Sequence, residues 1–144
     1  MPNMREINVS VIAEYRANGG TLTGPFAELP VLLLTTVGSQ TGRPHTTPLG
    51  FVIDGDRFIL AASNGGARQD PHWFHNLVAA PEVRVELLAE TFNATAAVIQ
   101  GPERARRFDQ LAGALPDMAE YERGSGRTIP VVALTRDSEV RGPQ

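Results

Sequence analysis

Residues 30–62 read PVLLLTTVGSQTGRPHTTPLGFVIDGDRFILAA, and the pattern of this stretch decides the fold. The stretch opens on a continuous apolar run, residues 30–37, of the length and composition of a strand buried on both faces. Residues 38–44 carry two glycines and a proline, which is typical of a turn. Residues 45–53 alternate loosely between polar and apolar side chains, which indicates a second strand.

Asp54-Gly55 is the strongest short hairpin signal in the chain, and it predicts that residues 57–62 return as a partner strand. Outside this stretch, a stripe of apolar residues predicts an N-terminal helix that ends at Gly19-Gly20; the stripe is Ile7, Val11, Ile12 and Tyr15. Asp70 suits an N-cap, and Pro71 suits the first position of a helix over residues 71–79. Three further strands are predicted over residues 82–88, 92–99 and 128–134. A helix is predicted to begin at Pro102, and a short helix is predicted over residues 116–122. The inner face of the helix from Pro102 is formed by Ala105, Phe108, Leu111, Ala112 and Leu115.

Six short strands linked mostly as hairpins, with helices between them, predict the α+β class with β structure dominant. The expected architecture is an antiparallel barrel with helices plugged into its openings. The length of 144 residues predicts one domain over 1–144, with the first helix within residues 1–20 and a frayed tail over 137–144.

Composition excludes several kinds of chemistry. The chain has no cysteine and no lysine, because all 13 basic residues are arginine. Disulfides, thiolate nucleophiles, Schiff bases and phosphate-loop lysines are therefore absent. A net charge of −3 argues against a nucleic-acid partner. The lack of a long apolar run or a signal-peptide core predicts a cytoplasmic protein with no transmembrane segment.

Residues 63–76, SNGGARQDPHWFHN, raise the question of a metal site because two of the three histidines lie three residues apart. His45 is the other histidine, and no carboxylate is obviously placed as a further ligand. We therefore expect no metal and a solvated polar helix face. The preceding Gly65-Gly66 pair lets backbone amides approach a ligand, although a plain connecting turn explains it as well.

The chain resembles the deazaflavin-dependent nitroreductase family, the split-barrel reductases that use reduced coenzyme F420. The resemblance covers nearly all of residues 30–134. It rests on one ordered set of motifs: Thr35-Thr36, Thr41-Gly42-Arg43-Pro44, Pro48-Leu49, Ala62-Ser63-Asn64-Gly65-Gly66, Pro71-x-Trp73-x-x-Asn76-Leu77 and Arg127-Thr-Ile-Pro130.

The resemblance implies an antiparallel split β-barrel and a set of coenzyme contacts. The phosphate and tail would be held by the turn and the strand after it: Ser39, Gln40, Thr41, Arg43, His45, Thr46, Thr47, Pro48, Leu49 and Gly50. The deazaflavin ring would lie along Ala61, Ala62, Ser63 and Asn64, with Arg68 nearby. The helix would wall the ribityl region with His72, Trp73, Phe74, His75 and Asn76. Ser63 and Tyr121 are the expected catalytic residues.

Five positions depart from the family pattern. Relatives carry basic residues where this chain has Ser39 and Gln40, and often an arginine in place of His45. Charge-assisted contacts to phosphate are about twice as strong as neutral ones, so either coenzyme binding is weaker or Arg43 and Arg68 compensate. Leu115 and Met118 stand at aromatic positions of the substrate pocket.

We therefore hypothesise an F420H2-dependent reductase that transfers a hydride to a small, flat, apolar acceptor such as a quinone, enone, nitroaromatic or coumarin-like lactone. The alternatives are an FMN-dependent split-barrel oxidoreductase and a non-catalytic protein that binds a coenzyme or an apolar ligand. A homodimer and a peripheral membrane contact both stay open. The N-terminal helix is expected to pack on the barrel or cap the pocket.

Overall fold

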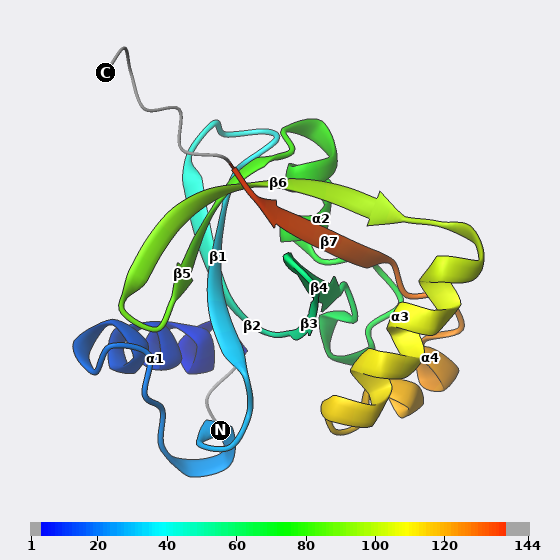
Figure 1. The fold of residues 1–144 in the computed structure, drawn as a ribbon, viewed down its shortest axis with the longest axis horizontal. Coiled ribbons are helices and arrows are strands. Elements are labelled where there is room, and N and C mark those ends of the chain that lie inside the picture. Colours follow the sequence, from blue (N-terminus) through cyan, green and yellow to red (C-terminus); the bar gives the residue numbers. More distant parts are fainter. Residues whose placement is uncertain (1–3, 138–144) are drawn as a thin grey trace.

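The structure is a computed structural model, and it describes residues 4–137 (Figure 1). Four α-helices are present in this range: α1 (Met4–Ala17), α2 (His72–Ala79), α3 (Gly101–Ala114) and α4 (Met118–Ser125). Two short 3₁₀ helices are η1 (Gly24–Phe26) and η2 (Asn64–Gly66). The strands are β1 (Val31–Val37), β2 (Pro44–Gly50), β3 (Val52–Asp54), β4 (Arg57–Ala61), β5 (Glu82–Leu87), β6 (Glu90–Ile99) and β7 (Val131–Arg136).

All seven strands form one antiparallel sheet in the order β2-β1-β5-β6-β7-β4-β3. The two edge strands, β2 and β3, are consecutive in the chain and are separated only by Phe51. Gly50 pairs with Val31 at one end of the sheet, and Val52 pairs with Ile59 at the other end. The sheet must therefore curl until its two edges approach each other, which confirms the predicted α+β barrel-like class.

This closure makes one prediction wrong. We expected a single strand over residues 45–53, but the segment divides at Phe51 because the chain crosses there from one edge of the sheet to the other. The number of strands is accordingly seven rather than six. The hairpin signal at Asp54-Gly55 is confirmed, with Gly55 (φ 59°) and Asp56 as the two turn residues between the paired Asp54 and Arg57.

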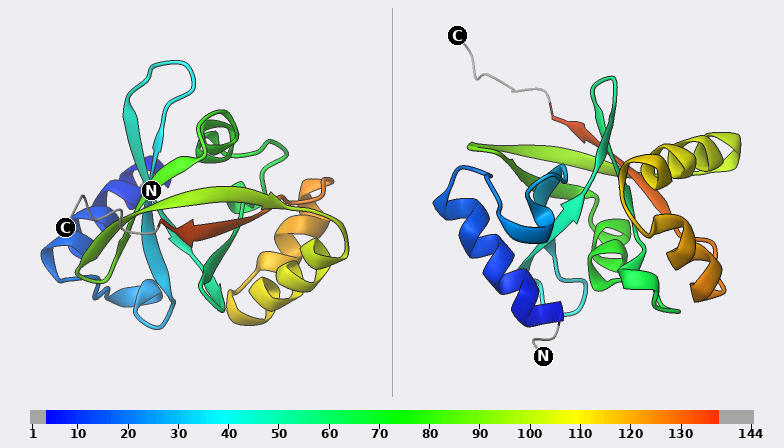
Figure 2. Two further views of the ribbon diagram at one scale, coloured as in Figure 1. Left: turned by 45° about the horizontal axis from the view of Figure 1, so that its top comes forward. Right: turned by 90° about the horizontal axis from the view of Figure 1, so that it is seen from below.

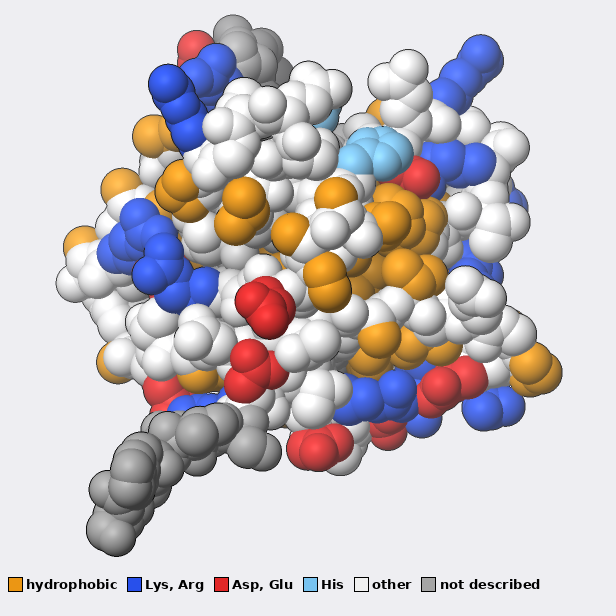
Figure 3. All heavy atoms as spheres, turned by 90° about the horizontal axis from the view of Figure 1, so that it is seen from above, with side chains coloured by type: hydrophobic (Ala, Val, Ile, Leu, Met, Phe, Trp, Pro, Cys, Tyr) orange, Lys and Arg blue, Asp and Glu red, His pale blue; other side chains and the backbone are white. Residues whose placement is uncertain are grey.

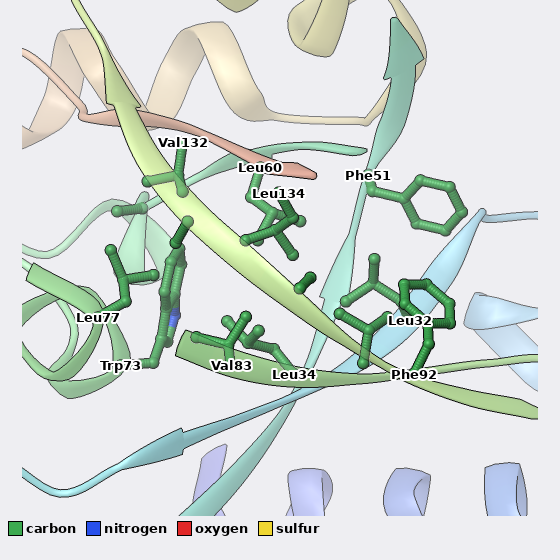
Figure 4. Close-up of a cluster of buried hydrophobic side chains, with 14 residues drawn as sticks. Leu32, Leu34, Phe51, Leu60, Trp73, Leu77, Val83, Phe92, Val132 and Leu134 are labelled. Atoms are coloured by element: carbon green, nitrogen blue, oxygen red, sulfur yellow. The ribbon is translucent and has the colours of Figure 1, made fainter. Parts of the chain in front are cut away.

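The interior of the curled sheet holds the largest hydrophobic cluster, in which Trp73 and Leu77 from α2 meet strand residues such as Leu34, Leu60 and Val132 (Figure 4). Helix α2 therefore plugs the barrel. A second cluster lies between α3 and the outer face of β4 and β7, and a third lies between α1 and β1. Figure 2 shows α1 at one end of the curled sheet and α3 with α4 at the other end.

Two local predictions need correction. We expected Ala105 on the inner face of α3, yet it is exposed, because the helix turns Phe108 and Leu111 inward instead. Asp70 does not cap α2, because its carboxylate pairs with Arg127 instead and Pro71 occupies the N-cap position without a side-chain bond. Of the expected tail, residues 138–144 lie outside the described range, while the Asp137 amide donates to the Asn93 carbonyl.

Helix α1 packs against strand β1, as expected. Val11 and Tyr15 are buried against Leu33. The Tyr15 hydroxyl lies 3.0 Å from the Val31 carbonyl oxygen and accepts from the Leu88 amide at 2.7 Å. Burial raises the pKa of Tyr15 above its usual value. A single hydroxyl thus joins α1 to β1 and to the turn between β5 and β6.

We predict that Tyr15→Phe lowers the free energy of unfolding by about 1–3 kcal/mol, because it removes the part-buried hydrogen bonds of the hydroxyl to the Val31 carbonyl and from the Leu88 amide. Urea denaturation monitored by circular dichroism measures the change. Tyr121→Phe is the matched control, since the Tyr121 hydroxyl has no hydrogen-bond partner in residues 4–137. Equal stabilities of the two variants would contradict the role given to Tyr15.

An ion cluster joins α3 to the hairpin of β3 and β4. Arg57 binds both Asp54 and Glu103, and Arg107 lies 3.1 Å from Asp54. The hydrogen bonds from Arg57 hold the pKa of Asp54 and of Glu103 below their usual values. A carboxyl group whose pKa is lower in the folded state contributes stability above its unfolded pKa, and this contribution is lost as the pH falls through the folded pKa.

Acid titration tests this cluster. Arg57→Gln should lower the melting temperature at pH 6, where both carboxylates are ionised in the folded and the unfolded chain. The difference from the wild type should shrink below about pH 4, where the unfolded carboxyl groups become protonated. Melting curves at pH 6 and pH 3 provide the comparison, and a difference that stays constant between them would show that the cluster does not stabilise the fold.

Candidate functional site

The buried amide of Asn76 ties α2 to the turn after β1. Asn76 is 5% exposed, its Oδ1 accepts from the Ser39 amide at 3.0 Å, and its Nδ2 donates to Thr36 Oγ1 at 3.1 Å. Because α2 follows the loop of residues 62–70 directly, this helix connects that loop with the turn of residues 38–43. The two segments that the motifs single out are therefore held by one helix.

The turn of residues 38–43 presents polar side chains at the end of the sheet. Gly38 leaves space that two neighbouring side chains occupy, since a Cβ atom at this position would lie 2.6 Å from Thr41 Oγ1 and 2.9 Å from His45 Nε2. Thr41 and His45 therefore converge over Gly38. Five exposed side chains surround this point: Ser39, Gln40, Thr41, Arg43 and His45. Arg43 has no ion-pair partner within residues 4–137.

Strand β2 divides its residues between two faces. Thr46 Oγ1 lies 2.7 Å from Thr35 Oγ1, whereas Thr36, the next residue, turns toward Asn76 on the side of α2. Alternation along the strand then places His45, Thr47 and Leu49 on the side of α2, and Thr46 and Pro48 on the opposite side. Leu49 packs against the interior core, and the backbone of Gly50 lies against Leu115.

The loop of residues 62–70 carries Ser63, Asn64 and Arg68. Asn64, Gly65 and Gly66 all have positive φ angles, of 51°, 63° and 87°. Asn64 Nδ2 donates to the Gln69 carbonyl at 3.0 Å, so this side chain is used within the loop. Ser63 is half-buried and Arg68 is exposed, without an ion-pair partner in the described part of the chain. The backbone amides of Ser63, Asn64 and Gly65 likewise bond to no acceptor in residues 4–137.

Arg127 holds this loop in place. Its guanidinium donates to the carbonyls of Ala62, Ser63, Ala67 and Gln69, and it pairs with Asp70 at 2.6 Å. Sequence reasoning noticed Arg127 as part of a motif but gave it no role. An arginine that follows two glycines and precedes a strand was the available signal, but nothing in the sequence showed which distant loop it contacts.

Tyr121, the second expected catalytic residue, lies against the same loop. Its ring is half-buried, and a Cβ atom on Gly66 would come within 3.0 Å of it. Tyr121 of α4 therefore lies against the same loop that carries Ser63. Leu115 and Met118 are buried in the cluster under α3, each 7% exposed, so they support the tyrosine's helix rather than line an open surface.

The predicted helix residues divide between the core and the surface. Trp73 lies in the interior core at 6% exposure, and the half-buried Phe74 ring meets it edge-on at 6.5 Å. His72 and His75 are exposed, and Figure 3 shows histidine side chains on the molecular surface beside hydrophobic ones. Residues 4–137 contain no group of three or more His, Asp or Glu side chains close enough to hold a metal ion. Ala61 is 8% exposed and Ala62 is 0% exposed, so neither presents an open surface at the expected ring site.

Two hollows of about 400 and 380 Å³ lie elsewhere on the surface. The first is between α1 and η1, and the second is on β1, β5 and β6 around Arg84. Neither is lined by a residue of the expected coenzyme set. No helix in residues 4–137 has the length and apolarity needed to cross a membrane.

Comparison with solved structures defines the class of protein. An F420-H2 dependent reductase, FDR-A, matches with a TM-score of 0.67 and 32% identity over 73% of this chain and 93% of that one. A structure described as a domain-swapped dimer matches with a TM-score of 0.69 and 30% identity over 88% of this chain and 96% of that one. The fold is that of the split-barrel F420-dependent reductases.

The chain belongs to the F420H(2)-dependent quinone reductase family, whose model matches residues 7–136. An F420H(2)-dependent quinone reductase of Mycobacterium tuberculosis is 38% identical over 110 residues, which cover 74% of each chain. The expected family, enzyme class and cofactor are confirmed: the chain is an F420-dependent oxidoreductase, and coenzyme F420 is supported over FMN.

Replacing Asn76 tests the link between α2 and the turn. Asn76→Ala should lower the free energy of unfolding by roughly 2–3 kcal/mol, because Thr36 and the Ser39 amide lose their buried partners. His75→Ala, one residue earlier on the exposed side of the helix, should change it by less than about 0.5 kcal/mol. Chemical denaturation of both variants measures the effect, and a wild-type stability for Asn76→Ala would refute the link.

Proposed function

We propose that this chain reduces a flat, apolar acceptor, foremost a quinone, at the expense of reduced coenzyme F420. Enones, nitroaromatics and coumarin-like lactones are acceptors of the same shape and electron demand. The observation that carries the proposal is the match of residues 7–136 to the quinone reductase family. The absence of cysteine and lysine agrees with it, since bound F420H2 supplies the hydride and the protein needs no nucleophile.

We further propose that the turn and the loop joined by α2 form the coenzyme site, and their donors fit the molecule. The coenzyme carries a phosphate and an anionic polyglutamate tail. Arg43 and Arg68 are exposed cations without ion-pair partners in the described residues, and Ser39, Gln40, Thr41 and His45 add neutral donors beside Arg43. The free amides of Ser63, Asn64 and Gly65 suit the polar edge of a deazaflavin ring. Arg43 and Arg68 would then take the place of the basic residues missing at 39, 40 and 45.

Within this site the proposed contacts are direct for some residues and indirect for others. His45, Thr47 and Leu49 share the side of α2, and Ser63 follows the buried Ala62 backbone. Trp73 and Asn76 are proposed to support the site without contacting the coenzyme. Trp73 fills the hydrophobic core, and Asn76 binds the turn of residues 38–43. His72 and His75 assist phosphate binding from the helix surface. Thr46 and Pro48 support β2 from its other face.

The chemistry asked of the protein is positioning of the acceptor and stabilisation of the negative charge that develops on its oxygen. The Ser63 hydroxyl is proposed to donate a hydrogen bond to that oxygen or to the adjacent ring. Tyr121 is proposed to orient the acceptor or to supply its proton.

The direct test mixes protein, reduced F420 and menadione and follows reoxidation of the coenzyme by its absorbance. We expect turnover that depends on the protein. Ser63→Ala should lower kcat by about 10²–10³-fold, as is typical when one such donor is removed. Wild-type turnover by Ser63→Ala would overturn the role of the serine, and tight coenzyme binding without any turnover would overturn the proposed function.

A double variant tests the part played by the histidines. His72→Ala with His75→Ala should weaken coenzyme binding by less than about tenfold, because neutral surface donors contribute modestly. Fluorescence titration with oxidised F420 measures the affinity, and elemental analysis of the wild-type protein should find no stoichiometric zinc. A complete loss of binding, or one zinc per chain, would contradict this assignment.

A further inference from the structure

We propose that Arg127 is a positioning residue of the reaction: it fixes the conformation of the loop of residues 62–70 and thereby places Ser63 and Tyr121. The proposal rests on the function proposed above insofar as Ser63 and Tyr121 act on the acceptor. It concerns a residue outside the expected coenzyme and substrate contacts.

The guanidinium of Arg127 is wholly occupied by the loop. Nε donates to the Ala67 carbonyl at 3.0 Å, and Nη1 donates to Asp70 Oδ1 at 2.6 Å. Nη2 is shared by three carbonyls, at 3.0 Å from Ala62, 3.1 Å from Ser63 and 3.2 Å from Gln69. All three nitrogens thus bind acceptors spread over nine residues of chain, and no donor nitrogen is left without an acceptor. Arg127 therefore acts through the loop rather than on a ligand.

Arg127 is itself held firmly. Its side chain is 15% exposed. Its backbone amide donates to the hydroxyl of Ser125, and that hydroxyl lies 3.0 Å from the Glu122 carbonyl oxygen. Two residues further on, the Ile129 amide donates to the Glu122 carboxylate, which also pairs with Arg104 of α3. The backbone of Arg127 is consequently fixed to α4 and α3, and its side chain extends from there to the loop.

The loop needs such support because its own bonds are few. Asn64 has a positive φ, which is unfavourable for a residue with a side chain, and two glycines follow it. The bonds within the loop are the Gly66 amide to Ser63, the Ala67 amide to Asn64 and the Asn64 side chain to Gln69. Four carbonyls pointing at one site repel one another, and the cation offsets that repulsion.

The same support reaches both proposed catalytic residues. The Ser63 carbonyl binds Arg127 directly, which orients the residue that carries the hydroxyl. Gly66 lies within the held loop, and its Cα region packs on the Tyr121 ring. This arrangement requires a planar guanidinium with donors on three nitrogens, since a lysine has a single ammonium nitrogen that cannot bind all of these acceptors. The structure thus gives a physical reason for an arginine at this position.

The experiment compares Arg127→Met, Arg127→Lys and Asp70→Asn with the wild type. Arg16→Met is the matched control, because Arg16 makes a bidentate ion pair with Glu86 on the far side of the barrel. Amide hydrogen exchange of the coenzyme-free proteins gives a readout that does not depend on activity. Steady-state reoxidation of F420H2 by menadione then separates kcat from KM.

For Arg127→Met we expect at least tenfold faster exchange of the Gly66 and Ala67 amides, which bond within the loop, with exchange over β1 and β5 unchanged. We expect kcat to fall at least tenfold, and the KM for the coenzyme to rise as well, because the same loop carries amides proposed to contact the coenzyme. Arg127→Lys and Asp70→Asn should fall between Arg127→Met and the wild type in both readouts. Arg16→Met should keep the wild-type kcat and the wild-type exchange of the loop.

Unchanged exchange of the Gly66 and Ala67 amides in Arg127→Met would overturn the proposal, as would a kcat equal to that of Arg16→Met. If Arg127→Met fails to fold, Arg127→Lys and Asp70→Asn test the proposal by the same two measurements, amide exchange and kcat. A wild-type protein without menadione turnover would refute the proposed function separately, because the exchange measurement still tests the hold of Arg127 on the loop.

Discussion

The structure depends on one constraint: the two edge strands of a seven-stranded sheet are consecutive in the chain and are joined through a single residue, Phe51. The Phe51 amide donates to the Pro30 carbonyl, and its ring meets Phe58 edge-on at 5.7 Å inside the curl. No flat sheet satisfies this connection. The curl creates an interior, the interior must be filled with apolar side chains, and its opening must be closed by a helix.

Helix α2 meets that last requirement, and the candidate site follows from how it does so. Trp73 and Leu77 fill the interior, which sets the rotation of the helix. That rotation buries Asn76 at the turn after β1 and leaves His72 and His75 exposed. The loop before the helix is then held from the other side by Arg127. Two segments that are separated in the sequence by residues 44–61 are in this way fixed to one frame by polar contacts.

Local structure was largely predictable because it follows local patterns. The hairpin at Gly55, the apolar strand β1 and the stripe of α1 were each evident from spacing alone, and the ordered motifs identified the reductase family. The division at Phe51 was not predictable, because it reflects a meeting of the two sheet edges rather than any break in the pattern. The sequence does not show that Asn76 is buried, because only the fold supplies the partners that draw its amide inward. Asp70 has the chemistry of an N-cap, and the distant Arg127 outcompetes that role.

We propose that the turn of residues 38–43, together with His45, and the loop of residues 62–70 are two parts of one F420 site. Amide hydrogen exchange with and without saturating oxidised F420 tests it most directly. The account predicts that protection appears in both segments together, with half-saturation at one coenzyme concentration, and that the groove between α1 and η1 is unaffected. Protection confined to one segment, or centred on that groove, would contradict the account.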